Sequence, residues 1–315
     1  MRLITERIDR VTAAPNKSAI ARPPRSVKIE ATSGCSLRCL FCKLKDREAQ
    51  PTAPMEWELF RRLAFEMKEY GVKEIGLFYI SEPFFQPERL IKAIEYSKQI
   101  GYEYVFLTTN GGLARPDLVE KAMAAGLDSL KFSINFCDHD QFERIAQRPG
   151  INYERALENL RAARKVRDQG HYDCGLYASS IQFDGDQAAK MEELLAKRVR
   201  PYVDETYFLP LYSFGGVKVD GVGKPIAGNQ GRIGALREGL PCWALWEGHI
   251  RASLDGKRAY LSACCFGADD TFDVADLTEM SFADGWNSEK FVNLRKAHLH
   301  RDVSGTVCEK CLAYQ

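Results

Sequence analysis

Three cysteines lie close together near the N-terminus of this 315-residue chain, at Cys35, Cys39 and Cys42. Three thiols so close in sequence cannot all pair with one another as disulfides. They can converge on one inorganic cluster, and thiolates are the usual ligands of iron–sulfur clusters. A four-iron cube has four corners, so three protein ligands leave one iron open to bind another molecule. The spacing therefore predicts a reactive cluster, with zinc as the alternative, although structural zinc usually takes four protein ligands.

Strand and helix patterns alternate along the first two thirds of the chain. Apolar alternation predicts strands, and apolar residues at helical spacing predict helices. Six such units form parallel βαβ repeats that can curve into an open barrel, a partial (β/α)6 TIM-like barrel of the α/β class. The cysteine loop follows the first strand, at the end where barrels carry their chemistry. The expected strands are 27–31, 74–80, 104–108, 129–134, 174–183 and 205–211, and the expected helices are 57–70, 87–100, 116–125, 153–169 and 187–199.

The sequence changes character after residue 212, where glycines crowd together. A linker or substrate-side loop is favoured over a phosphate cradle, because no strand–loop–helix frame or lysine followed by serine or threonine supports the latter. Further on, 249–254 and 258–263 predict a β-hairpin that turns at Asp255-Gly256, and 288–298 predict a helix. We therefore expect an N-terminal arm over 1–25 that is disordered or straps the domain, a barrel over 26–212, and a linker with a hairpin-and-helix subdomain over 213–315.

Composition excludes several classes of partner. The formal net charge of +1 gives no long-range attraction to nucleic acid or to anionic membranes. No apolar run approaches the roughly 18 residues that a membrane span needs. Ten cysteines in a chain without a secretion signal indicate metal or redox chemistry rather than a disulfide framework. We expect a cytoplasmic protein.

The CxxxCxΦC run, with Phe41 before its last cysteine, resembles that of the radical S-adenosylmethionine (radical SAM) enzymes. The resemblance implies that the open iron chelates the amino and carboxylate groups of SAM. An electron from the cluster then cleaves the sulfonium, and the resulting 5′-deoxyadenosyl radical takes a hydrogen atom from a substrate C–H bond. An external one-electron reductant of the flavodoxin or ferredoxin type is also implied.

Further segments resemble the SAM-binding motifs of that family. Ser81-Glu82-Pro83 stands where the family has a Gly-Glu-Pro type of motif that holds the methionine amino group, with serine in place of glycine. Ser133-Ile-Asn135 is similar to a segment that binds the ribose and the carboxylate. An arginine that pairs with the carboxylate is either Arg144 or Arg148, of which Arg148 is preferred. The cofactor-binding residues that the resemblance implies are Phe41, Ser81, Glu82, Asn110, Ser133, Asn135 and Arg148.

The tail resembles the twitch subdomain, a short relative of the SPASM extension in some radical SAM enzymes. It implies an auxiliary 4Fe–4S cluster with four cysteine ligands, which can pass electrons but cannot bind substrate. A four-cysteine zinc site is the alternative. In this assignment Cys265 is not a cluster ligand and is the candidate hydrogen donor. In the reverse assignment Cys265 is the ligand and Cys264 is the donor. The implied ligands are Cys242, Cys264, Cys308 and Cys311.

The resemblance leaves several reactions open. The spare thiol of Cys265 favours epimerisation of a small polar molecule, such as a sugar, an aminocyclitol or a nucleoside. The alternatives are dehydrogenation of a secondary alcohol with the auxiliary cluster as electron acceptor, and peptide (RiPP) maturation, for which the usual N-terminal recognition domain is missing. A non-catalytic iron–sulfur or zinc scaffold is a further class. The sequence names no general base, and the candidates for inward-pointing substrate contacts are Tyr177, Gln182, Tyr207 and Tyr212.

Overall fold

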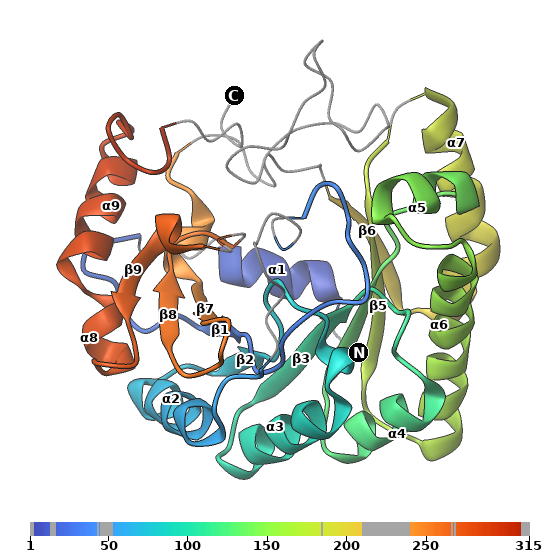
Figure 1. Ribbon diagram of the computed structural model, residues 1–315, viewed down its shortest axis with the longest axis horizontal. Helices are drawn as coiled ribbons and strands as arrows, with labels where there is room; N and C mark the ends of the chain where they lie inside the picture. Colours follow the sequence, from blue (N-terminus) through green and yellow to red (C-terminus); the bar gives the residue numbers. More distant parts are fainter. Residues whose placement is uncertain are drawn as a thin grey trace.

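The computed structural model describes residues 3–12, 17–42, 44, 53–183, 185–209, 240–265, 267 and 269–309. One curved sheet of nine strands forms its centre, in the order β6-β5-β4-β3-β2-β1-β7-β8-β9. Figure 1 shows α2, α3, α4 and α6 along the outside of this sheet. The strands are β1 Ser26–Ile29, β2 Glu74–Gly76, β3 Tyr104–Thr109, β4 Ser129–Ser133, β5 Gly175–Ile181, β6 Glu205–Leu209, β7 Gly248–Ala252, β8 Ala259–Ser262 and β9 Asp273–Asp276.

The predicted βαβ alternation is confirmed. Strands β1 to β6 pair in parallel with their neighbours in chain order, and helices connect them. The two ends of the sheet do not pair with each other, so the barrel is partial, as expected. The helices that cover it are α2 Trp57–Tyr70, α3 Pro87–Gln99, α4 Pro116–Ala124, α5 His139–Ala146, α6 Ile151–Gly170 and α7 Gly185–Leu194.

The packing of α2 illustrates why these helices form. Its apolar residues recur at helical spacing, and Phe60, Leu63 and Met67 are completely buried against the sheet. The helix ends at Gly71, whose φ of 113° lies in the left-handed region that suits glycine at this position. The sequence pattern therefore determines both the buried face and the end of the helix.

One sequence prediction was wrong in detail. The strand expected over 74–80 ends at Gly76, because residues 77–82 leave the ladder and lead into a short 3-10 turn, η2 Pro83–Phe85. The predicted C-terminal hairpin is confirmed as β7 and β8. Strand β7 also pairs in parallel with β1, so β7, β8 and β9 extend the barrel sheet. The tail also contains β9 and α8 Phe282–Trp286, which were not predicted, and the expected helix, α9 Glu289–Leu299.

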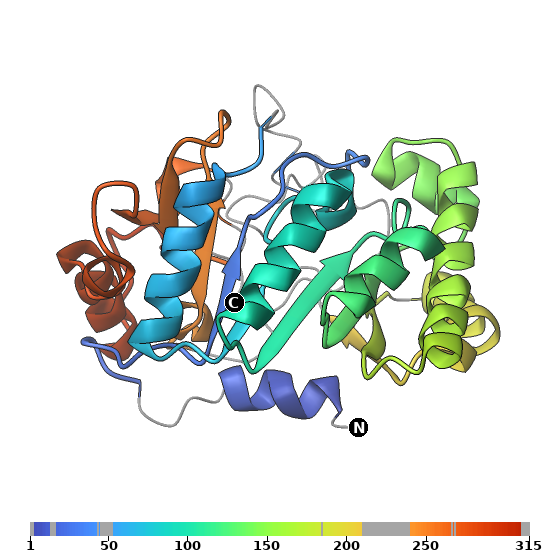
Figure 2. The same cartoon turned by 90° about the horizontal axis from the view of Figure 1, so that it is seen from below.

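The N-terminal arm contains a helix, α1 Ile4–Thr12, which straps the barrel. Arg7 of this helix pairs with Glu74 at 2.5 Å and lies 4.0 Å from the ring centroid of Phe106. Glu205 accepts a hydrogen bond from the backbone N of Ile4 at 2.7 Å. Glu74 and Glu205 are the first residues of β2 and β6, so α1 lies across the amino ends of the strands, as Figure 2 shows.

Candidate functional site

Two hydrogen bonds hold the start of the cysteine loop against the segment that follows β2. The Ser81 hydroxyl donates to the carbonyl of Thr32 at 3.0 Å, and the Glu82 backbone N donates to the carbonyl of Gly34 at 2.8 Å. Gly34 has a φ of 77°, and a Cβ there would lie 2.8 Å from the Phe85 ring. Both observations require glycine immediately before Cys35.

The other side of the loop is held by the end of α5. The backbone N atoms of Arg38 and Leu40 donate to carbonyls of α5 residues 146 and 145, each at 3.0 Å. Arg148 donates from Nε to the carbonyl of Ser36 at 2.8 Å. The Phe41 ring packs on Phe136, with 6.3 Å between the ring centroids. The loop is therefore fixed at several points before any cofactor binds.

The three thiols are free of disulfides and partly exposed. The pKa of Cys35 is raised to about 12, mainly by burial and also by the charges of Glu82 and Cys42. Thiolates can be held together here only if a bound cation compensates them, which iron ions do. In the described part of the chain, no three His, Cys, Asp or Glu side chains are close enough to hold a single metal ion.

Glu82 and Asn110 meet beside this loop. The buried Glu82 carboxylate accepts hydrogen bonds from the Thr109 hydroxyl at 2.6 Å, the Asn110 backbone N at 2.8 Å and the Phe84 backbone N at 3.2 Å. Asn110 Nδ2 lies 3.6 Å from the Sγ atom of Cys35. Burial raises the pKa of Glu82 to about 7, even though its three donors oppose this shift. The structure thus gathers two predicted SAM-binding residues next to the first cysteine.

The other predicted cofactor contacts lie at the same end of the sheet. Ser133 ends β4 opposite Ser179 of β5, and both Ser133 and Asn135 are partly exposed between buried neighbours. Lys131, on the same strand, donates to the Tyr207 hydroxyl at 3.2 Å. The Ser81 hydroxyl and the Arg148 guanidinium already bind loop carbonyls, and their roles toward SAM stay predictions.

The substrate-contact candidates of the late strands are only partly placed by the structure. Tyr177 is buried, whereas Tyr207 is partly exposed. The Gln182 backbone N donates to Leu209 at 2.8 Å and prolongs the pairing of β5 with β6. Tyr212 lies outside the described residues, as does Cys311 of the predicted auxiliary ligand set.

The C-terminal cysteines lie at the end of β8 and beside α9. The Cys242 backbone N donates to Nδ1 of the buried His298 at 3.2 Å. The Cys265 pKa lies well above its ordinary value because of burial and of its neighbours Cys264 and Cys242. The Cys264 carbonyl accepts a hydrogen bond from the Tyr79 hydroxyl. Cys242 lies near enough to Cys265 to raise its pKa, and the Tyr79 hydrogen bond joins the cysteine pair to the segment that leads to Glu82.

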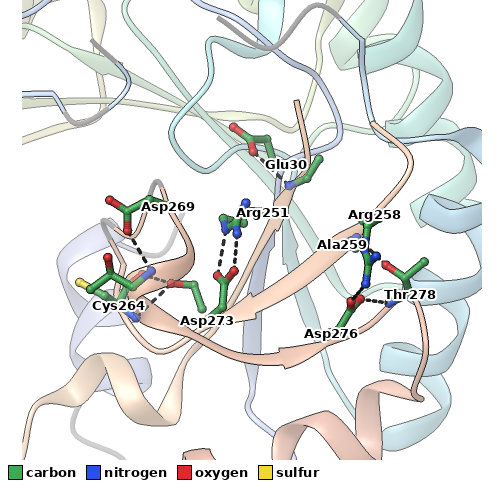
Figure 3. A network of polar contacts seen from close by, with 12 residues as sticks. Glu30, Arg251, Arg258, Ala259, Cys264, Asp269, Asp273, Asp276 and Thr278 are labelled. Atoms are coloured by element: carbon green, nitrogen blue, oxygen red, sulfur yellow. Dashed lines mark hydrogen bonds and ion pairs between the residues drawn. The ribbon is translucent and has the colours of Figure 1, made fainter. Parts of the chain in front are cut away.

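Ion pairs fasten β9 to the hairpin below these cysteines. Arg251 of β7 pairs with Asp273 through two contacts, one of them 2.8 Å from Nε to Oδ1, and Arg258 pairs with Asp276. Figure 3 shows both pairs, with Cys264 at the end of the hairpin. The unpredicted strand is thus tied to the hairpin that ends at the cysteine pair.

Comparison with known proteins decides the family. The model of the radical SAM superfamily matches residues 29–173, and the model of the SPASM iron–sulfur cluster-binding domain matches residues 242–312. The chain belongs to the radical SAM superfamily. Its cofactors are therefore SAM, a SAM-binding 4Fe–4S cluster and an auxiliary 4Fe–4S cluster. The residue-level ligand sets stay predictions.

Curated relatives of this radical SAM protein have several activities. A probable GTP 3′,8-cyclase of Saccharolobus solfataricus is 23% identical over 304 residues, covering 85% of this chain and 91% of the relative. An AdoMet-dependent heme synthase of Methanosarcina barkeri is 29% identical over 148 residues, covering 47% of this chain and 41% of the relative.

Solved structures show the same fold at lower identity. BtrN in complex with AdoMet and 2-DOIA has a TM-score of 0.56 at 14% identity and covers 91% of this chain and 92% of BtrN. SuiB of Streptococcus suis bound to the precursor peptide SuiA has a TM-score of 0.64 at 14% identity and covers 99% of this chain and 76% of SuiB. No described helix is long and apolar enough to cross a membrane.

Sequence reasoning missed a polar cluster where the radical SAM barrel meets the tail. Lys28 of β1 pairs with Glu247 at 2.8 Å, and Nε2 of the buried His249 lies 3.3 Å from the same carboxylate oxygen. The His249 ring packs on Tyr79 at 5.7 Å. A lysine at a central position of a short apolar strand was the signal available in the sequence.

Proposed function

We propose that this radical SAM enzyme abstracts a hydrogen atom from a C–H bond of a small polar substrate, such as a sugar, an aminocyclitol or a nucleoside, and epimerises that carbon. The cluster and SAM together supply the 5′-deoxyadenosyl radical. A thiol of the Cys264–Cys265 pair returns a hydrogen atom to the substrate radical from the opposite face. The resulting thiyl radical takes one electron from an external reductant and one proton, and this restores the thiol.

One observation carries this proposal. A four-cysteine auxiliary cluster needs only one member of the adjacent pair in addition to Cys242, Cys308 and Cys311, so one thiol is spare. The hydrogen bond from Tyr79 to the Cys264 carbonyl places the pair beside the segment that ends at Glu82. This contact supports a donor from the pair acting on a substrate bound next to the predicted SAM pocket.

Both members of the pair are candidates for the donor. The Cys265 thiol is close enough to Cys242 and Cys264 for their charges to raise its pKa, after burial as the main cause. This position suits a cluster ligand as well as a donor. Replacing each cysteine separately by alanine and measuring iron identifies the ligand, because only the ligand variant loses auxiliary iron. The other cysteine is then the donor.

Isotope incorporation tests the reaction. Candidate sugars, aminocyclitols and nucleosides are first screened for those that stimulate formation of 5′-deoxyadenosine. The reaction of a positive substrate is then run in D₂O, where the exchangeable S–H becomes S–D. Epimerisation gives a product that carries one deuterium at the inverted carbon. The alanine variant of the donor should still cleave SAM but should form no epimer. A product that lacks deuterium would refute the thiol donor.

Dehydrogenation is the second candidate. Its support is the fold likeness to BtrN, whose structure contains AdoMet and 2-DOIA and covers 91% of this chain. Here the substrate radical would lose an electron to the auxiliary cluster and a proton to a base, so the product would be two hydrogens lighter. The single cysteine variant that keeps the cluster would then retain turnover. The fold likeness to peptide-bound SuiB supports a third candidate, a peptide maturase. If a peptide is the only class of substrate that stimulates 5′-deoxyadenosine formation, this candidate replaces epimerisation and dehydrogenation.

A further inference from the structure

Lys131 of β4 lies on the inner face of the curved sheet. Its neighbour Phe132 is completely buried, and a Cβ added at Gly111 would touch both the Phe132 ring and Ala156 of α6. Phe132 therefore faces the helices that cover the outside of the sheet (Figure 1). Successive side chains of a strand point to opposite faces. The side chains of Lys131 and Ser133 thus point away from the helices and into the barrel, and both residues are partly exposed.

Lys131 reaches the row of side chains that contains a predicted SAM contact. Ser133 is in register with Ser179 of β5, and Ser179 is in register with Tyr207 of β6. Register partners point to the same face of a sheet. Lys131 Nζ donates a hydrogen bond to the Tyr207 hydroxyl at 3.2 Å and lies 5.6 Å from the centroid of its ring. Lys131 and Tyr207 therefore form a polar pair inside the barrel, toward the carboxyl ends of the strands.

No carboxylate in the described part of the chain forms an ion pair with Lys131, whose side chain contacts Tyr207 instead. Glu205 lies in the same row of the sheet as Lys131, two strands away. Its carboxylate, however, accepts hydrogen bonds from backbone N atoms at the start of α1, the shorter of them 2.7 Å long. Lys28 of β1 differs in this respect, because it pairs with Glu247 at 2.8 Å.

A partly buried cation of this kind favours an anionic ligand. Moving a charge out of water costs free energy unless an opposite charge or hydrogen bonds compensate it. An ammonium group has three protons to donate, and a tyrosine hydroxyl can accept one hydrogen bond while it donates another. Lys131 and Tyr207 can therefore donate together to the oxygens of one anion without breaking the hydrogen bond between them.

We propose that Lys131 and Tyr207 bind an anionic group of the substrate, a phosphate or a carboxylate. The substrate is then an acidic derivative of a sugar, a cyclitol or a nucleoside. This inference rests on the part of the proposed function that assigns a small polar substrate, and it does not depend on whether that substrate is epimerised or dehydrogenated.

Matched pairs of neutral and anionic compounds test the preference for charge. The pairs are inositol with inositol monophosphate, adenosine with adenosine monophosphate, and glucose with glucuronate. Isothermal titration calorimetry measures their binding to the protein that carries its clusters and is saturated with SAM, without reductant. We expect an anionic compound to bind more tightly than its neutral partner, and the phosphate and carboxylate pairs show which anion is preferred. Lys131→Gln should weaken binding of that anion roughly ten- to a hundredfold and leave the neutral partner unaffected.

Two further variants control for indirect effects. Lys165→Gln removes the same charge at an exposed position of α6 and should leave every affinity unchanged. Tyr207→Phe removes only the hydroxyl and should weaken binding of the anionic compound more than that of its neutral partner. This variant decides the question if Lys131→Gln does not fold.

The differences within each pair decide the outcome. The proposal is overturned if no anionic compound binds more tightly than its neutral partner, or if the preference persists in Lys131→Gln. It is also overturned if Lys131→Gln raises the SAM dissociation constant as much as that of the anion, because the lysine would then belong to the SAM site. No radical forms without reductant, so this result is independent of the deuterium analysis that tests epimerisation.

Discussion

Replacing Glu82 by glutamine tests the predicted SAM pocket most directly. The glutamine side chain would keep the shape of the glutamate but lose the charge that we expect to hold the methionine ammonium group. A hydrogen bond to a charged group contributes roughly 1.5–3 kcal/mol. At about 1.4 kcal/mol for each tenfold change, the SAM dissociation constant should rise roughly ten- to a hundredfold. Iron content should not change, because Glu82 is not a predicted cluster ligand.

The structure supplies a control for indirect effects of this substitution. Glu82 also accepts a 2.6 Å hydrogen bond from the Thr109 hydroxyl, so its loss could disturb the ends of β2 and β3. Thr109→Val removes that hydrogen bond and keeps the charge. We expect Thr109→Val to lower the free energy of unfolding by about 1 kcal/mol and to leave SAM affinity within a few-fold of wild type. Isothermal titration calorimetry with SAM measures both affinities.

The pH dependence gives this prediction a second readout. The Glu82 pKa is raised to about 7, mainly by burial, so the carboxyl is mostly protonated at pH 6 and mostly ionised at pH 8. Only the ionised form attracts the ammonium group. Wild-type affinity should therefore rise by about tenfold from pH 6 to pH 8, whereas the affinity of Glu82→Gln should be independent of this group. An unchanged dissociation constant in Glu82→Gln, or identical pH profiles of the two proteins, would refute the assignment.

Three further predictions concern stability and cluster content. The raised pKa of Glu82 stabilises the fold below pH 4.5, and this contribution is lost as the pH rises through 7. In urea unfolding experiments, the free energy of unfolding of the apoprotein should therefore fall by about 3 kcal/mol over this pH range relative to that of Glu82→Gln. Replacing the three cysteines of the 35–42 loop by alanine should leave about four iron atoms per chain and abolish SAM cleavage; a variant that retains zinc instead contradicts the auxiliary cluster. Arg7→Met should lower the free energy of unfolding by about 3 kcal/mol, because the buried Glu74 loses this partner and keeps its ion pair with Arg25. The control Arg10→Met, at an exposed position of the same helix, should change it by less than about 0.5 kcal/mol.

The barrel could be predicted from the sequence because its signals are local. Apolar spacing in α2 and the proline that starts α4 act within a few residues, and both helices formed close to the expected bounds. The pairing of β7 with β1 was not predictable in this way. It joins residues more than 200 positions apart, such as Val27 and Gly248, and no short-range pattern marks such a partner.

The candidate site likewise has residues that the sequence indicates and partners that only the fold reveals. The cysteine spacing and Glu82 carry chemistry in their residue types, so the sequence indicated them. The partners of Glu82 are Thr109 and backbone N atoms, which look like ordinary strand-end groups until the fold brings them together. Lys28 and Glu247 become recognisable only once β1 and β7 are neighbours.

The early end of β2 explains how one segment reaches both the cysteine loop and the C-terminal cysteine pair. Had the strand continued to Ile80 as expected, Tyr79 would have remained in the ladder of the sheet. Because the chain leaves the ladder after Gly76, Tyr79 can reach the Cys264 carbonyl, while Glu82, three residues later, reaches the end of β3 beside Cys35. One short segment thus contacts both cysteine sites. Its length limits how far apart the two cysteine sites can lie.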